Sequence, residues 1–268
     1  MAKQSDKDDA ALTLALMFRD KSKTPEWMQL ALDFELIDDF AQKKMGQQET
    51  FKHLAEGSSP NARSRREGEE GWTPLMYEAD RGYGQSLRIL FLHKPDPNLK
   101  SDAGETALMI AARQGNHAVF KELIIEFHLA EKTLEMNAVN PEGKTALMLA
   151  AENGNTECVN GLLTHGADPN MQDKDGRTAL ICAVQASQTN SMGTLLNHPL
   201  NPMLQDKAGK SAFDYARDTD QPQVVAMLEA KRKEYLAALG ESIDKEGLLT
   251  GQNMTVRKPL GFKKGPAA

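Results

Sequence analysis

The chain has 268 residues, of which 40% are hydrophobic and 6% aromatic, and its formal net charge is −6. This acidic balance argues against a protein that binds duplex nucleic acid, because such proteins usually present a basic surface. The chain has two cysteines, a charged opening segment and no long apolar run, so we expect no disulfide framework, no signal peptide, no membrane insertion and a cytoplasmic location.

Residues 1–61 carry two helical patterns. The first covers residues 9–18. The second begins at the helix-start signal Thr24-Pro25-Glu26, after which apolar residues recur at steps of three or four from Trp27 to Met45. We therefore expect this segment to be helical.

One template recurs five times in the next part of the chain. Its copies are GWTPLMYEADRG from Gly71, GETALMIAARQG from Gly104, GKTALMLAAENG from Gly143, GRTALICAVQAS from Gly176 and GKSAFDYARDTD from Gly209. Successive Thr or Ser positions are 33, 39, 33 and 33 residues apart, so six extra residues (39 − 33) interrupt the period within residues 127–136. Such a period is typical of small units that bury their apolar faces by stacking.

These copies, together with LLTHGADPN at 162–170, resemble the ankyrin repeat. The resemblance implies an all-α repeat solenoid in which each unit is a β-turn finger followed by two antiparallel helices. It places five clear repeats in a domain at 62–239. Residues 1–61 contain a segment similar to half a repeat, so they form either a degenerate repeat that caps the array or a separate helical module. Residues 240–268 have weak periodicity and are expected to be a disordered tail.

Within each repeat, the Thr or Ser is expected to cap the first helix, and the Leu or Phe two residues later is expected to point into the core. Gly82, Gly115 and Gly154 are expected to end first helices in the left-handed conformation. Met76, Met109 and Met148 form a column that favours core packing. The six extra residues are expected to lengthen the second helix of the Gly104 repeat or to add a turn. Asn98, Asn137 and Asn170 are expected to bond the turn backbone.

We find no constellation of residues that is typical of catalysis or of metal binding. His93, His165 and His198 occupy the same slot near the end of the second helix, where an imidazole can interact with terminal carbonyls. Cys158 and Cys182 fall in apolar slots, which favours buried and inert thiols. We therefore expect no enzyme activity, no metal and no cofactor. An enzyme whose site lies in residues 1–61 is kept as an alternative.

The resemblance implies a monomeric, non-catalytic module that holds another protein against its fingers and the ends of its first helices. A second alternative is a secreted bacterial effector, for which the partly basic C-terminus would serve as a translocation signal. Trp72 is either an anchor for the partner or a residue that packs on the N-terminal helices. The expected contact residues are Trp72, Asp80, Arg81, Lys100, Asp102, Glu105, Arg113, Gln114, Glu142, Lys144, Glu152, Asn153, Lys174, Asp175, Arg177, Gln185, Lys207 and Lys210.

Overall fold

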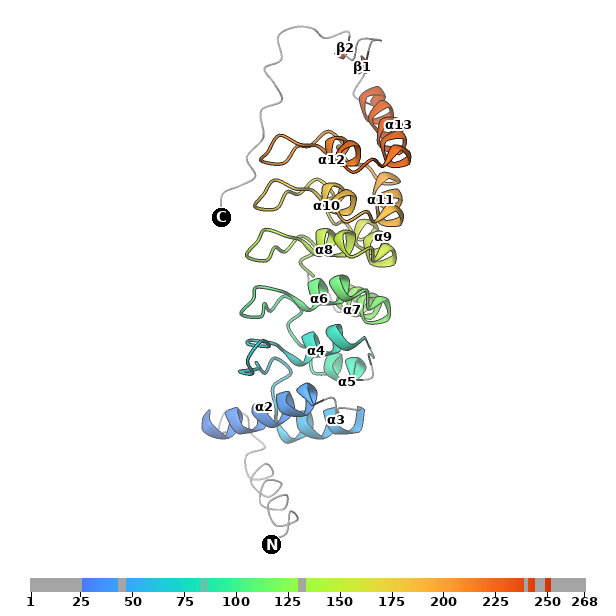
Figure 1. Ribbon diagram of the computed structural model, residues 1–268. Helices are drawn as coiled ribbons and strands as arrows, with labels where there is room; N and C mark the ends of the chain where they lie inside the picture. Colours follow the sequence, from blue (N-terminus) through green and yellow to red (C-terminus); the bar gives the residue numbers. More distant parts are fainter. Residues whose placement is uncertain are drawn as a thin grey trace.

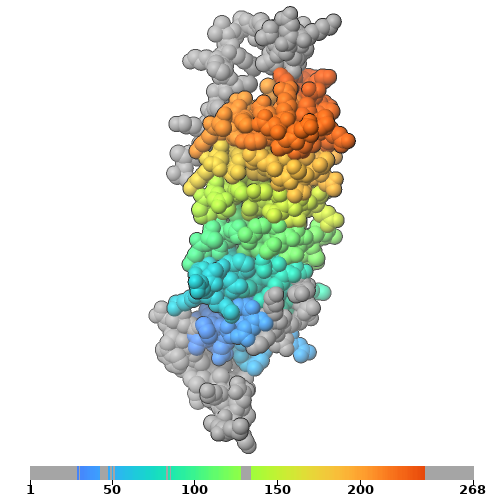
Figure 2. All heavy atoms as spheres, in the orientation of Figure 1, coloured from blue at the N-terminus to red at the C-terminus, as the bar shows by residue number. Residues whose placement is uncertain are grey.

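Helix pairs stack along one axis in the computed structural model, and the loop that precedes each repeat's first helix projects to one side (Figure 1). The structure describes residues 26–42, 47–82, 84, 86–129, 134–238, 241–243 and 249–251. In the space-filling view, successive repeats form successive bands of one column (Figure 2). This arrangement confirms the predicted all-α repeat solenoid. The helix predicted at 9–18 lies outside the described residues.

Each repeat contributes one inner helix, on the side of the loops, and one outer helix. The inner helices are α4 (Pro74–Arg81), α6 (Ala107–Gln114), α8 (Ala146–Glu152), α10 (Ala179–Gln185) and α12 (Ala212–Asp218). The outer helices are α5 (Leu87–Leu92), α7 (His117–Leu129), α9 (Thr156–Thr164), α11 (Thr189–Leu196) and α13 (Pro222–Ala238). Before them come α2 (Glu26–Ala41) and α3 (Gln47–Glu56).

The inner helices begin where the sequence predicts. Thr106, Thr145 and Thr178 each accept a hydrogen bond from the backbone N–H three residues later at 3.3 Å, and Thr73 does so at 3.4 Å. The last repeat differs, because the Ser211 hydroxyl donates to the carboxylate of Asp214 at 2.6 Å. Four of the five predicted caps therefore satisfy a free backbone donor through the hydroxyl oxygen.

Gly82, Gly115 and Gly154 have the predicted positive φ at the ends of three inner helices, where neighbouring repeats also meet. Gly115 has φ 72°, and the Asn155 side chain of the next repeat donates to the carbonyls of Ala112 and Arg113 at 2.8 Å each. A Cβ at Gly115 would lie 2.5 Å from Asn155 Oδ1. Glycine is thus required here both by its backbone angle and by the close approach of the next repeat.

The core runs through all five repeats. The inward Leu or Phe of every inner helix is buried, and the methionine column at Met76, Met109 and Met148 is at most 1% exposed. This confirms the prediction that these thioethers fill the core between repeats. Small residues such as Ala111 and Ala150, both 0% exposed, let the helices approach closely.

The predicted insertion extends an outer helix. Helix α7 has 13 residues, whereas α9 has nine and α11 has eight. The added turn places Phe127 in the core, where its ring meets Phe91 of α5 edge-on at 5.3 Å between centroids. Leu134 then packs against the core and Glu135 is exposed. Residues 130–133, which include Glu131 and Lys132, lie outside the described part of the chain.

The N-terminal helices pack on the first repeat. Leu36, Ile37 and Phe40 of α2 form a second buried cluster with Tyr77 and Leu90 of the first repeat. Asn61 Oδ1 accepts from the Asp96 backbone at 2.8 Å. The predicted Asn98, Asn137 and Asn170 make the same bond to the backbone of the repeat that follows, at 2.7–3.0 Å. The division of the chain at residue 61 stays a prediction.

Six residues of the segment predicted to be disordered form regular structure. Strands β1 (Glu241–Ile243) and β2 (Leu249–Gly251) pair antiparallel, with Ser242 opposite Thr250. Pairing satisfies backbone groups that an isolated extended segment leaves to water, and β1 also contacts α13. The rest of residues 240–268 lies outside the described part of the chain.

Candidate functional site

The fingers of the later repeats are short hairpins that hydrogen bonds close. In the third repeat, Asn140 N–H donates to Lys144 O at 3.1 Å, and Gly143 N–H donates to Asn140 O at 2.9 Å with φ 79°. The Asn140 side chain also accepts from the backbone of Glu142 and Lys144. In the fourth and fifth repeats, the side chains of Asp173 and Asp206 accept the equivalent hydrogen bonds from the finger backbone. The finger backbone is therefore fixed before any partner binds.

Backbone hydrogen bonds join neighbouring fingers. Asp102 N–H donates to Glu70 O at 3.0 Å, and Lys174 N–H donates to Glu142 O at 2.9 Å. Lys207 N–H donates to the carbonyl of Asp175 at 2.8 Å. The fingertips of several repeats thus form one connected surface rather than separate loops.

The junction between the second and third fingers is built differently. Pro141 occupies the register position of Asp102 and Lys174 and has no N–H to donate. Here the side chain of Lys100 reaches across and donates to Val139 O at 2.8 Å. A side-chain bridge therefore spans the junction where a backbone donor is missing.

Five of the eighteen predicted contact residues lie in ion pairs that link a finger to its own inner helix. The residue before the capping Thr or Ser pairs with the residue eight positions later, in three repeats. These pairs are Glu105–Arg113 at 3.2 Å, Lys144–Glu152 at 2.7 Å and Lys210–Asp218 at 2.7 Å. In the fourth repeat, Arg177 pairs with Asp173 and Asp175 of its own finger at 2.8 and 3.2 Å.

These ion pairs fix the orientation of the charged side chains that take part in them. Other charged residues at the fingertips, such as Lys174 and Lys207, are not part of these pairs. Burial acts to lower the pKa of Lys144, but the hydrogen bond and the charge of Glu152 raise it. Lys144 is therefore a fixed cation at any neutral pH. All the predicted contact residues are exposed or half-buried, and Lys174 and Lys207 at the fingertips are exposed. We call the fingers and the inner-helix ends the finger surface.

The sequence profile described as ankyrin repeats (3 copies) matches residues 40–132, 78–173, 121–206 and 150–236, which together span more than half of the chain. The chain belongs to the ankyrin-repeat family. Ankyrin repeats are in general modules for protein–protein interaction. A comparison with individual curated proteins gives no match. Among the described residues, no helix is long and apolar enough to cross a membrane.

Trp72 lies at the start of the ankyrin array and is half-buried. It packs against both hydrophobic clusters, that of the repeats and that of α2 and α3. Its ring centroid lies 5.2 Å from that of Tyr77, and Tyr77 stacks on Phe40 of α2 at 6.3 Å. The packing alternative thus has a direct structural basis, while contact with a partner stays a prediction.

Two other predicted contact residues of the first repeat have neighbours within the array. The Arg81 guanidinium carbon lies 5.5 Å from the Tyr77 ring centroid. The Asp80 carboxylate accepts from Gln114 of the next repeat. Both residues are half-buried. This part of the finger surface is therefore more constrained than the tips of the later fingers.

Two of the three histidines near the ends of the outer helices, His93 and His165, bond helix carbonyls as predicted, and for His198 this stays a prediction. His93 Nδ1 lies 3.0 Å from Ile89 O, and His165 Nδ1 lies 2.8 Å from Gly161 O. Each imidazole thus bonds a carbonyl one helical turn earlier. In the described part of the chain, no group of three or more His, Cys, Asp or Glu side chains is placed to hold a metal ion.

Two histidines have carboxylate partners that the sequence reasoning missed. His53 Nε2 lies 2.9 Å from Asp39 Oδ2, and His117 Nδ1 lies 3.2 Å from Glu157 Oε2. Each pair joins residues that are distant in the sequence, so local spacing gave no signal. The His53–Asp39 pair links α3 to α2, and His53 Nδ1 has no hydrogen-bond partner among the described residues. The pair therefore fits a cross-link between helices better than a catalytic dyad.

Both cysteines should be unreactive while the protein is folded. Cys158 and Cys182 are 1% and 2% exposed, and burial raises the pKa of each thiol to about 12. At pH 8 only about one thiol in 10⁴ would be ionised. We expect almost no reaction with an aromatic disulfide reagent in buffer and reaction of two thiols per chain in 8 M urea. Rapid labelling of either cysteine in buffer would contradict this burial; single Cys→Ser variants assign the signal.

Glu78 is a buried carboxylate that the sequence reasoning did not single out. It is 3% exposed and takes the register position of Ala111 and Ala150. Its Oε2 has no hydrogen-bond partner among the described residues. Burial raises the pKa of this carboxyl, although a hydrogen bond with the Ser86 side chain acts to lower it. Ionising Glu78 therefore destabilises the fold.

Glu78→Gln should raise the free energy of unfolding at neutral pH by about 1 kcal/mol, because it removes the buried charge. A raised carboxyl pKa gives stability that is present below the unfolded value of 4.5 and lost as the pH rises above it. The advantage of the variant should therefore shrink between pH 7.5 and 4.5 in urea unfolding. The exposed Glu122→Gln on α7 is the matched control. If the free energies of unfolding of Glu78→Gln and the parent chain differ by the same amount at every pH, the burial argument is contradicted.

Proposed function

We propose that the chain is a non-catalytic recognition module that binds another protein on the finger surface. The observation that carries the proposal is the construction of this surface. Neighbouring fingers are joined by backbone hydrogen bonds, or by the Lys100 side chain between the second and third fingers. Ion pairs fix charged side chains in three repeats. A surface that is already ordered loses little conformational entropy on binding.

Two fingertip lysines without an ion pair among the described residues favour a partner of mixed or negative charge at this point. Lys174 and Lys207 occupy equivalent positions on the fourth and fifth fingers and are exposed. Their backbones are fixed by the links between fingers. Unlike Lys144 and Lys210, which pair with Glu152 and Asp218, they are available to an incoming carboxylate.

Affinity capture tests this proposal with three forms of the full chain as bait. The first is the parent chain, the second is Lys174→Glu/Lys207→Glu, and the third is Lys121→Glu on the exposed face of α7. We expect mass spectrometry to find a protein that the parent and the α7 variant retain and that the finger variant loses. Equal capture by all three forms would contradict recognition by the fingers. The secreted-effector alternative stays a prediction, because it depends on a translocation signal in residues 240–268.

A further inference from the structure

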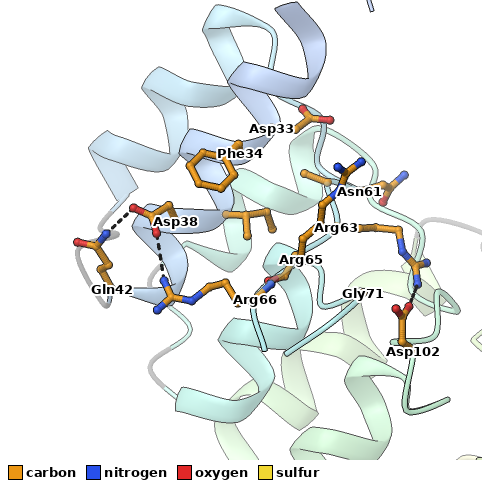
Figure 3. A pocket seen from close by; sticks show the side chains of 13 residues that line it. Asp33, Phe34, Asp38, Gln42, Asn61, Arg63, Arg65, Arg66, Gly71 and Asp102 are labelled. Carbon is orange, nitrogen blue, oxygen red and sulfur yellow. Dashed lines mark hydrogen bonds and ion pairs between the residues drawn. The ribbon is translucent and has the colours of Figure 1, made fainter. Parts of the chain in front are cut away.

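A groove of about 850 Å³ opens between α2 and the first finger, at the N-terminal end of the array. Helix α2 lines it with Asp33, Phe34, Ile37 and Asp38, and the finger lines it from Asn61 to Arg66 (Figure 3). Apart from Asp102, none of the predicted contact residues takes part in it. The first finger is longer than the others, which leaves room for this hollow.

The groove has an apolar side. Phe34 is 65% exposed, although it is a large aromatic residue on a helix whose neighbouring Ile37 is only 4% exposed. Ala62 of the finger, at 3%, closes the opposite side. An exposed ring over a hollow with a buried apolar floor is a suitable contact for an apolar side chain of a ligand.

Two of the three arginines that line the groove form ion pairs with acidic residues. Arg66 pairs with Asp38 at 3.0 Å and with Glu69 at 3.7 Å. Arg63 pairs with Asp102 at 3.1 Å, and also donates to a backbone carbonyl at 2.9 Å. These pairs fasten the finger to α2 on one side and to the second finger on the other.

Arg65 is different from its two neighbours. It is exposed, and it makes no ion pair or hydrogen bond with any residue in the described part of the chain. Its side chain extends from the finger toward the part of the groove where Asp33 and Asn61 lie (Figure 3). The remaining carboxylate, Asp33, accepts from Ser59 N–H and from Gln29 Nε2, both at 2.7 Å. Arg65 is thus a cation without an ion-pair partner among the described residues, in a groove that also exposes the Phe34 ring.

The walls of the groove are held in place without a ligand. Ser64 N–H donates to Trp72 O, and Gly71 N–H donates to Ser64 O, both at 2.8 Å, which closes the long finger into a hairpin. Tyr77 of α4 donates to Glu69 at 2.8 Å, and Glu69 in turn faces Arg66. A groove that is already formed binds with a smaller entropic cost than a loop that must be ordered.

We propose that this groove binds a peptide segment of a partner protein in which a carboxylate side chain lies next to an aromatic or aliphatic one. The carboxylate pairs with the planar guanidinium of Arg65, which can form two parallel hydrogen bonds with it. The apolar side chain packs on Phe34. The inference rests on the proposed function and names the chemistry of one part of the partner.

Selection from a random peptide library displayed on phage, with the full chain as target, tests the inference. We expect the selected peptides to share Asp or Glu beside Phe, Leu or a similar residue. A fluorescent synthetic copy should bind the parent chain and lose about tenfold or more of its affinity on Arg65→Glu and on Phe34→Ala. Arg88→Glu on the exposed face of α5 should bind as the parent does. Because Arg65 and Phe34 are exposed, unfolding midpoints should be unchanged.

Selection of basic peptides, the absence of any selected peptide, or unchanged affinity of Arg65→Glu would each overturn the inference. Peptides whose affinity depends on Lys174 and Lys207, but not on Arg65, would overturn it while supporting recognition by the fingers. Conversely, peptides that depend on Arg65, together with a captured protein that is indifferent to finger substitutions, would support the groove and contradict the proposed function.

Discussion

Leu147→Ala should lower the free energy of unfolding by about 2–5 kcal/mol, because the substitution removes buried methyl groups and leaves a cavity. Leu147 is 1% exposed and lies on α8, the middle inner helix, which packs between α6 and α10. In a solenoid each interface contributes to the stability of the units on both sides of it. Urea denaturation monitored by circular dichroism measures the loss.

The matched control is Leu228→Ala on α13. Leu228 is also buried, at 0% exposed, but its repeat has a neighbouring repeat on one side only. We expect a smaller loss, because the terminal unit can loosen without opening the centre of the array. Equal losses at the two positions would contradict the view that stability is shared between neighbouring repeats.

Trp72→Ala should lower the free energy of unfolding by about 2–4 kcal/mol. The indole is half-buried and packs against both hydrophobic clusters, so its loss should loosen α2 and α3 from the array. Tyr77→Phe is a suitable control, since it keeps the ring that stacks on Phe40 and removes only the hydroxyl that bonds Glu69.

The same Trp72 variant separates its two roles when its stability and its affinity for the captured partner are compared. Unchanged affinity with a large loss of stability would show that Trp72 is a packing residue and would contradict its assignment to the finger surface. Unchanged stability with a large loss of affinity would contradict the contacts that we describe with the N-terminal helices.

The repeat architecture could be predicted because its causes are local and periodic. The Thr145 hydroxyl caps a backbone N–H only three residues later in the chain. The positive φ of Gly115 is likewise a local property, because it depends on the residue type at that one position. The extension of α7 followed from counting residues between repeats. The charge pairs between finger and helix were also readable, since residues eight positions apart carry opposite signs in three repeats, but this signal was not used.

The groove and the buried Glu78 could not be predicted in the same way. Phe34 and Arg65 belong to segments that do not follow the repeat, and their proximity depends on how α2 packs on the first repeat. Glu78 occupies a position where other repeats have alanine, and the sequence does not show whether a longer side chain there turns outward. Both features depend on tertiary contacts that periodicity does not encode.

Lysine footprinting of the complex tests recognition by the finger surface most directly. Lys174 and Lys207 on the fingers and Lys121 on α7 are all exposed in the free chain, so each should be acetylated readily. When the captured partner is added to saturation, we predict that Lys174 and Lys207 become protected while Lys121 reacts as before. Protection of Lys121 with unchanged labelling of both finger lysines would contradict the proposed function.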